Sequence, residues 1–310
     1  MPPSSVECEG LPQGGPPRGR GDQGKINLLN RFERMKALGP SFIDITWGAG
    51  GSTSATTLEL TLAAQKEIGL NTCMHLTCTN MDREQIDHAL ETCHANGVQN
   101  ILALRGDPPQ GQERWVATDC NFSYGSDLVK YIRQKYGDHF CIAVAGYPEG
   151  HQDNECKESD LQHLKSKVDA GADFIVTQLF YDVEEYLRFV ARCRAIGITC
   201  PILPGIMPIY THAGWTRMTT MCKVAVPPAM AARMEELKDS PEEVLAYGED
   251  FIVQMMTQLQ EAGVKQFHIY TLNQDALVTR ILRRLDLLQE ESPKSASLPS
   301  TAPTSPSNSP

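Results

Sequence analysis

Residues 141–180 read CIAVAGYPEGHQDNECKESDLQHLKSKVDAGADFIVTQLF, and this stretch decides the fold class. It opens with the apolar run Cys141–Pro148 and closes with the apolar run Phe174–Phe180. Between the two runs, Ser159–Ala170 has helical spacing and is followed by Gly171, a typical residue just past a helix. Two near-continuous apolar strands joined by a helix are the repeating unit of a parallel sheet covered on both faces.

The same alternation continues in both directions along the chain. Further short apolar runs predict strands at Phe42–Gly48, Thr72–Cys78, Asn100–Asp107, Pro201–Pro208 and Gln266–Leu272. Helical spacing recurs at Ile26–Leu38, Ser54–Ile68, Asp82–Asn96, Ser126–Tyr136, Val183–Ile196, Met218–Ala262 and Asp275–Gln289. A helix that precedes the first visible strand implies one more strand before it, so the pattern predicts an α/β fold, a (β/α)8 TIM-like barrel whose first strand is altered or missing. A doubly wound open sheet is the alternative, but it favours a GxGxxG turn after its first strand, and the sequence has none.

The composition indicates a globular protein, with 310 residues of which 41 % are apolar and 21 % are charged. The formal net charge of −10 argues against nucleic acid and anionic membrane surfaces as partners. No apolar run is long enough for a membrane-spanning helix, and the first residues lack the apolar core of a secretory signal. The 10 cysteines form no CxxC pair, so we expect reduced thiols, a cytoplasmic location and no metal site.

The two ends of the chain differ from its middle. Residues 1–25 are rich in Gly and Pro and are expected to be a disordered or divergent segment, and residues 290–310 form a Ser/Pro-rich tail expected to be disordered. Residues 26–289 are left as one barrel domain. A sheet of only seven strands would expose two edges, so a lost first strand predicts marginal stability and weak activity.

Polar side chains cluster where the predicted strands end, which is where a (β/α)8 barrel carries its chemistry. Several of these ends form motifs, and with them the run from Ile26 to about Leu288 resembles the catalytic domain of the eukaryotic methylenetetrahydrofolate reductases, in a truncated form with an altered N-terminus. The motifs that carry the resemblance are DITWGAGGS (44–52), HLTC (75–78), ALRGDPP (103–109), AGYPEGH (145–151), DLQHLKSKVDAGADFIVTQLFYD (160–182), PGIMPI (204–209) and HIYTLN (268–273).

The resemblance implies a flavin enzyme of one-carbon and methionine metabolism. It implies bound FAD, NADPH or NADH as electron donor, and reduction of 5,10-methylenetetrahydrofolate to 5-methyltetrahydrofolate. The partner is then a small-molecule folate, and the sequence is also compatible with a homo-oligomer. Eukaryotic members carry a second domain that binds S-adenosylmethionine, and we expect none here, because the Ser/Pro-rich tail begins where that domain would.

Site residues follow from the resemblance position by position. Asp107 matches the aspartate that stabilises positive charge on the folate, and Gln178 matches the glutamine that contacts the pterin and the nicotinamide. Residues implied to hold FAD are Thr46, Trp47, Ala49, His75, Arg105, Gly106, Asp107, Tyr124, Gly125, Tyr147, His151, Asp160 and Lys167. His212 and Gln274 stand where the family has an aromatic cover and, in some members, an arginine on the folate.

The sequence departs from the family at its start. The family has a Glu-Phe-Phe-Pro-Pro strand whose glutamate protonates the folate, whereas this chain has Val6-Glu7-Cys8-Glu9-Gly10-Leu11-Pro12. Glu9 is the substitute that we expect for the family's acid. Two alternatives stay open: an impaired barrel that binds flavin or a full-length partner without turnover, and a different TIM-barrel flavin enzyme such as a proline dehydrogenase relative.

Overall fold

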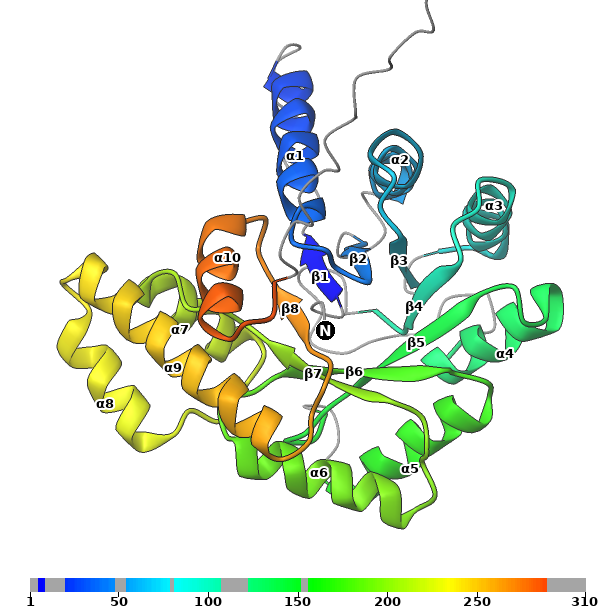
Figure 1. The fold of residues 1–310 in the computed structure, drawn as a ribbon. Helices are drawn as coiled ribbons and strands as arrows, with labels where there is room; N and C mark the ends of the chain where they lie inside the picture. Colours follow the sequence, from blue (N-terminus) through cyan, green and yellow to red (C-terminus); the bar gives the residue numbers. More distant parts are fainter. Residues whose placement is uncertain are drawn as a thin grey trace, which may run out of the picture.

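The protein is described by a computed structural model that covers residues 5–8, 20–47, 54–78, 81–106, 122–151 and 156–288. Within these ranges eight parallel strands follow one another around a closed barrel in sequence order (Figure 1). The strands are β1 (Ser5–Cys8), β2 (Phe42–Ile45), β3 (Thr72–Thr77), β4 (Asn100–Leu104), β5 (Cys141–Gly146), β6 (Phe174–Leu179), β7 (Ile202–Ile206) and β8 (His268–Tyr270).

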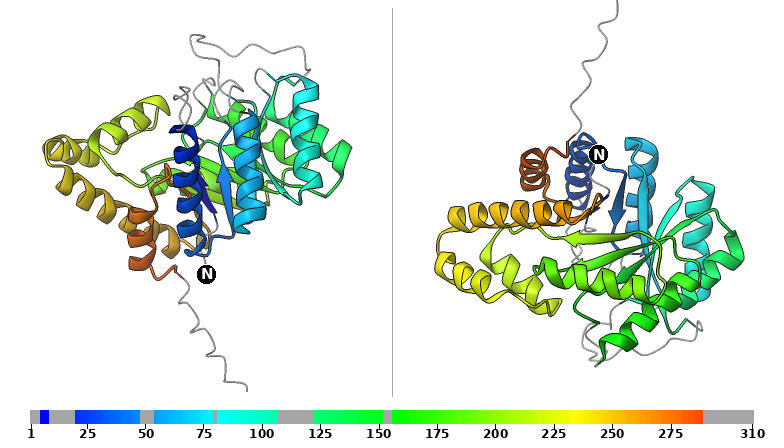
Figure 2. Two further views of the ribbon diagram at one scale, coloured as in Figure 1. Left: turned by 90° about the horizontal axis from the view of Figure 1, so that it is seen from above. Right: turned by 60° about the horizontal axis from the view of Figure 1, so that its bottom comes forward.

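Helices surround the barrel, and α8 and α9 extend away from it on one side (Figures 1 and 2). They are α1 (Arg20–Lys36), α2 (Ser54–Ala63) with a π-helical continuation (Ala64–Ile68), α3 (Arg83–Ala95), α4 (Gly125–Tyr136), α5 (Lys157–Asp169), α6 (Val183–Ala195), α7 (His212–Met221), α8 (Pro228–Leu237), α9 (Pro241–Glu261) and α10 (Asp275–Arg284). The (β/α)8 TIM-like barrel predicted from the alternation is therefore confirmed.

The first strand of this barrel is present, although the sequence left it in doubt. β1 pairs in parallel with β2 on one side and with β8 on the other, so it closes the sheet. Its four residues, Ser5–Cys8, lie before the Gly/Pro-rich stretch that argued against a strand. The prediction of a seven-stranded sheet with two open edges is wrong, because this short segment supplies the hydrogen bonds that both neighbouring strands require.

Two apolar layers hold the barrel together. The larger one lies between the strands and the surrounding helices and includes Ile101, Val144 and Ile175, all of them fully buried. The second lies inside the barrel and consists of Cys73, Leu102, Ala143, Phe174, Val176 and Leu203. Because successive strand residues point to opposite faces, burial on both faces requires the near-continuous apolar runs of the sequence.

Several predicted elements have different boundaries in the structure. The helical stretch Met218–Ala262 is divided into parts of three helices, and a proline begins both α8 and α9. Helix α1 begins at Arg20, six residues before the predicted start of Ile26–Leu38, so it includes part of the segment 1–25 that was expected to be disordered or divergent. The tail 290–310 lies outside the described residues.

Over the described ranges, no helix combines the length and apolar character needed to cross a bilayer. The same ranges contain no group of three His, Cys, Asp or Glu arranged to hold a metal ion. Eight cysteines from Cys73 to Cys222 are free thiols, and Cys73, Cys78, Cys93 and Cys193 are buried. Burial raises the pKa of the Cys93 thiol to about 12 and that of Cys193 to about 11, which makes both poor nucleophiles.

Candidate active site

A cavity of about 120 Å³ lies at the carboxyl ends of β4 and β5, between these strands and helices α4 and α5. This is the end of the barrel at which functional residues are expected. Its lining includes many of the residues that the resemblance implies for the cofactor: Arg105, Tyr124, Gly125, Tyr147, His151, Asp160 and Lys167. The structure thus brings together residues from three of the quoted motifs and from the segment Tyr124-Gly125.

One side of the cavity is built for an anion. Helix α4 begins at Gly125, and a Cβ at this position would lie 3.6 Å from the Ala103 carbonyl oxygen and 3.7 Å from Lys167 Cδ. Both are ordinary van der Waals distances, so strand β4 and the lysine pack directly against the start of the helix. Arg105 follows β4 and Lys167 lies on α5, so two cations meet the amino end of a helix, where unpaired N–H groups also favour negative charge.

Lys167 is the most perturbed cation of this cavity. Its ammonium group donates a hydrogen bond to the Ala145 carbonyl and lies 5.8 Å from the centre of the Tyr147 ring. The pKa of Lys167 is lowered to about 8, mainly by burial; the Asp160 carboxylate opposes this shift and the nearby Arg105 charge adds to it. A bound anion would compensate both lowering effects, so the lysine is prepared for a negatively charged ligand.

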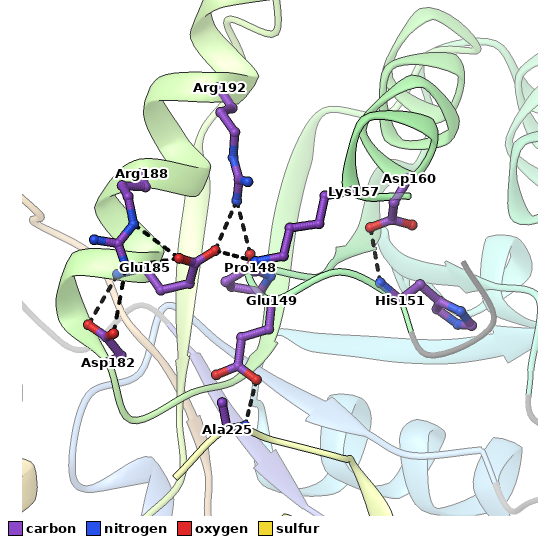
Figure 3. A network of polar contacts seen from close by, with 10 residues as sticks. All are labelled: Pro148, Glu149, His151, Lys157, Asp160, Asp182, Glu185, Arg188, Arg192 and Ala225. Carbon is purple, nitrogen blue, oxygen red and sulfur yellow. Dashed lines mark hydrogen bonds and ion pairs between the residues drawn. The ribbon is translucent and has the colours of Figure 1, made fainter. Parts of the chain in front are cut away.

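The turn that follows β5 supplies a further part of the lining, with Tyr147 and His151. The Tyr147 and His151 rings pack edge to face with their centres 4.5 Å apart. The backbone N–H of His151 donates to Asp160 Oδ2 at 3.3 Å, a contact drawn in Figure 3. Asp160 is buried although it is a carboxylate, and its contacts fix the start of α5 relative to the turn.

An aromatic pair stands at the outer rim of the cavity. Tyr124 is 53 % exposed, and its ring is stacked on His163 with 5.7 Å between ring centres and 17° between planes. Both residues line the cavity, one from the start of α4 and the other from α5. An exposed flat surface of this kind suits a planar ring of a ligand better than it suits water.

The interior of the barrel carries a buried carboxylate between two histidines. Asp44 Oδ2 lies 3.2 Å from His268 Nδ1, and Asp44 Oδ1 lies 3.7 Å from His75 Nε2. Asp44 is 1 % exposed and His268 is fully buried. Charged side chains are almost never found inside a barrel without partners, so this cluster needs a reason beyond packing.

Thr46 and Trp47 continue from β2 directly after this cluster. The Thr46 carbonyl accepts a hydrogen bond from Thr57 Oγ1 at 3.1 Å, which attaches the strand end to α2. Trp47 is buried in the apolar layer outside the barrel, and its indole N–H has no hydrogen-bond partner among the described residues. Gly106 follows Arg105 with φ 92°, a conformation that favours glycine.

The residues implied for the folate are less closely grouped. Gln178 is half-buried near the end of β6, and its side-chain oxygen accepts from the Leu179 N–H at 2.9 Å. Gln274 lines a separate cavity of about 310 Å³ between the ends of β7 and β8 and the starts of α7 and α10. His212 does not line that cavity: its Nε2 lies 3.9 Å from a carboxylate oxygen of Glu235 on α8.

Ala49, Asp107 and Glu9 lie outside the described residues. Two positions before Glu9, Glu7 is part of β1 and is paired in register with Asp44 on β2 and with Tyr270 on β8.

The sequence analysis missed Asp44 and His268, which form the buried cluster with His75. Asp44 and His268 begin two of the quoted motifs, DITWGAGGS and HIYTLN, so a signal was available. A single polar residue inside an apolar strand does not reveal its partner, because β2 and β8 are far apart in the sequence.

Comparison with known proteins supplies the remaining evidence. The family described as methylenetetrahydrofolate reductase matches residues 15–286. A maize protein named methylenetetrahydrofolate reductase (NADH) 1 is 51 % identical over 278 residues, which are 87 % of this chain and 47 % of the maize protein. Methylenetetrahydrofolate reductase 2 of Saccharomyces cerevisiae is 48 % identical over 275 residues, again 87 % of this chain and 46 % of the relative. This chain therefore spans about half the length of these relatives.

A bacterial relative is matched over most of its length. The 5,10-methylenetetrahydrofolate reductase of Pectobacterium carotovorum is 37 % identical over 258 residues, which are 83 % of this chain and 84 % of that protein. Among solved structures, a Clostridium thermocellum protein described as binding two copies of 5-methyl-5,6,7,8-tetrahydrofolic acid aligns with a TM-score of 0.62, at 14 % identity, over 93 % of this chain and 97 % of its own. At that identity the likeness concerns the fold alone.

Proposed function

This chain belongs to the methylenetetrahydrofolate reductase family, and we propose that it reduces 5,10-methylenetetrahydrofolate to 5-methyltetrahydrofolate with FAD as cofactor and a reduced nicotinamide nucleotide as donor. FAD, when bound, supplies the chemistry of accepting a hydride from the nicotinamide and passing it to the folate. The protein itself then has to bind and orient these molecules and to neutralise their negative charges. The observation that carries the proposal is the cavity between β4, β5, α4 and α5, whose charges and rings match the groups of this cofactor.

The donor set supports FAD part by part. Arg105, Lys167 and the amino end of α4 at Gly125 are suited to a pyrophosphate. The Asp160 carboxylate is a natural acceptor for sugar hydroxyl groups, and the exposed ring of Tyr124 offers a stacking surface for a planar base. A cavity of about 120 Å³ holds only a part of so large a molecule, which fits with the remaining implied contacts lying along the strand ends towards β2 and β3.

On the folate side, we assign charge stabilisation to Asp107 and orientation of the pterin to Gln178. A carboxylate beside a developing cation lowers the barrier only while it is ionised, so Asp107→Asn is expected to reduce folate turnover about 10²–10³-fold. Binding of FAD should change much less. Gln178→Ala removes a group that can both donate and accept, so we expect weaker folate binding with an unchanged flavin spectrum.

The proton donor is better assigned to Glu7 than to Glu9. The support is its register in β1 opposite Asp44 and Tyr270, in the strand that closes the barrel. Glu7→Gln should abolish folate reduction and retain oxidation of the nicotinamide donor by a second electron acceptor, because only the folate half of the reaction needs a proton. Glu9→Gln is the matched control and should remain active.

The test of the whole proposal begins with the purified protein, FAD and an absorbance spectrum. We expect stoichiometric flavin uptake and turnover of methylenetetrahydrofolate with NADH or NADPH, both supplied because the maize relative is named for NADH and a Caenorhabditis elegans relative for NADPH. Lys167→Met should weaken FAD binding about 10-fold or more, since hydrogen bonds to charged groups contribute about 1.5–3 kcal/mol. Lys165→Met on the same helix, which removes only a surface pair with Asp169, should not.

The outcomes separate the alternatives. Flavin uptake without folate turnover would favour a non-catalytic flavin-binding barrel. A folded protein that takes up no flavin would overturn the proposal.

A further inference from the structure

The turn from Tyr147 to Gly150 is tied to the rest of the protein from several directions (Figure 3). It has its own closing hydrogen bond, from the Gly150 N–H to the Tyr147 carbonyl at 3.1 Å. From outside the turn, Arg192 on α6 donates to the Pro148 carbonyl at 3.2 Å. The two flanking side chains, Tyr147 and His151, both line the cofactor cavity, so whatever holds this turn also holds that wall of the cavity.

Glu149 connects the turn to the residue that is most distant along the chain. Its Oε2 accepts a hydrogen bond from the backbone N–H of Ala225 at 2.7 Å. Ala225 lies in the connection between α7 and α8, 76 residues further along the chain. The contact therefore joins the loop after β5 to a loop that belongs to a different βα unit of the barrel.

The environment of Glu149 is unusual for a carboxylate. Its Oε1 is buried and has no hydrogen-bond partner among the described residues. Burial raises the pKa of Glu149, while the hydrogen bond from Ala225 opposes this shift. A partly buried acid with one oxygen unsatisfied carries a cost to stability, and such costs are retained where position matters for function.

The charged groups around Glu149 come from two helices. Glu185 and Asp182, at the start of α6, raise its pKa, and Lys157, at the start of α5, lowers it. Glu185 does not compete for the Ala225 N–H, because its own oxygens accept from Lys157, Arg188 and Arg192 at 2.9–3.1 Å. The neighbouring charges are thus paired with one another, and Glu149 has the tie to Ala225 as its own contact.

We propose that Glu149 is a positioning residue of the cofactor site: by bonding the Ala225 N–H it fixes the turn that carries Tyr147 and His151, and so determines how tightly FAD is held. This inference rests on the proposed flavin function. Glu149 does not line the cavity, so its effect must pass through the backbone of the turn. Arg192, which reaches the same turn through Pro148, acts as a second and weaker support.

The first experiment compares two substitutions at Glu149 in the full chain, with the FAD dissociation constant as readout. Glu149→Gln keeps a side-chain oxygen that can accept from Ala225, and FAD affinity should stay within about threefold of the parent. Glu149→Leu keeps the size and removes the acceptor, so FAD affinity should fall about 10-fold or more. The melting temperature of the FAD-free protein is measured beside it, because a purely structural role would lower that temperature without a separate loss of FAD affinity.

The second experiment removes the donor instead of the acceptor. Ala225→Pro has no backbone N–H and should weaken FAD binding as Glu149→Leu does, whereas Ala225→Ser keeps the N–H and should not. The double variant Glu149→Leu/Ala225→Pro should bind FAD no more weakly than the single variant with the lower FAD affinity, because both substitutions remove the same hydrogen bond. Arg192→Met should have a smaller effect, and Arg188→Met, whose ion pairs are with Glu185 and Asp182, is the matched control.

The results distinguish this inference from the function on which it depends. If the parent protein binds FAD and Glu149→Leu binds it equally well, the positioning role is wrong and the function stands. Additive losses in the double variant would also contradict the inference, because the two residues would then act separately. If the parent takes up no FAD, the proposed function itself fails.

Discussion

The interior of this barrel has two regions of opposite character. Strands β3 to β7 fill one region with Cys73, Leu102, Ala143, Phe174, Val176 and Leu203. The other region, formed by β2, β3 and β8, holds the buried groups Asp44, His75 and His268. The apolar region gains its stability from burial, which is non-directional, whereas the polar region is stable only while each group keeps its partner. Packing alone therefore explains the apolar region, whereas the polar region points to a functional requirement.

The largest expected effect comes from breaking the polar region. Asp44→Ala leaves two buried histidines without their carboxylate, and we expect a loss of about 3–5 kcal/mol in the free energy of unfolding. Asp44→Asn keeps the shape and a polar side chain beside the two histidines and should lose clearly less. Asp44→Leu restores the volume and should not restore the stability. Denaturant titration of the FAD-free variants checks this order. If Asp44→Leu were as stable as the parent protein, filling the volume would be enough, and the two regions would not differ in what stabilises them.

Truncation in the apolar region should cost less and follow volume. Val176→Ala removes two methyl groups from a site that is 4 % exposed, and we expect a loss of about 2 kcal/mol. Val176→Ile, which adds one methylene, tests how tightly the region is packed. The same denaturant titration applies, and a loss equal to that of Asp44→Ala would contradict the distinction between a packed and a paired region.

The pH dependence of FAD binding should come from the cavity at the open end of the barrel. The pKa of Lys167 is about 8 in the free protein, and an anionic ligand would raise it, so binding takes up a proton when the pH is above 8. FAD affinity should therefore be flat below pH 8 and fall by up to about 10-fold per pH unit above it. Titration of FAD at pH 7 and pH 9 measures this, and Lys167→Met should bind weakly with no such slope. An equal slope in Lys167→Met would assign the titration to another group.

The smallest effect is expected on the outer surface, far from both interior regions. Arg233 on α8 pairs with Glu236 at 2.8 Å, and both side chains are more than half exposed. Exposed pairs of this kind contribute little, so Arg233→Met should change the free energy of unfolding by no more than about 0.5 kcal/mol. Thermal melting of the variant gives the baseline against which the interior substitutions are judged. A loss comparable to that of Val176→Ala would show that the outer helices α8 and α9 contribute more than their contacts indicate.

Local patterns were sufficient for most of the fold. Apolar strands, helical periodicity and glycines after helices led to the barrel, because each of these signals depends on residues close together in the chain. The first strand was harder, since Ser5–Cys8 is short and stands beside Gly/Pro-rich sequence. Its two neighbours, β2 and β8, stabilise it through long-range pairing, which cannot be predicted from the propensities of the residues in the strand itself.

By itself, the sequence determined the fold class, the family and the residues at the strand ends, because alternation and motif order are properties of the chain read in one direction. Only the tertiary structure decided which of these residues meet. It brought Arg105, Gly125 and Lys167 into one cavity, directed His212 towards Glu235, and paired Asp44 with His268 and Glu149 with Ala225. The physical reason is that closing a barrel joins strands from the two ends of the chain, and partners separated by 76 residues, as Glu149 and Ala225 are, leave no periodic trace in the sequence.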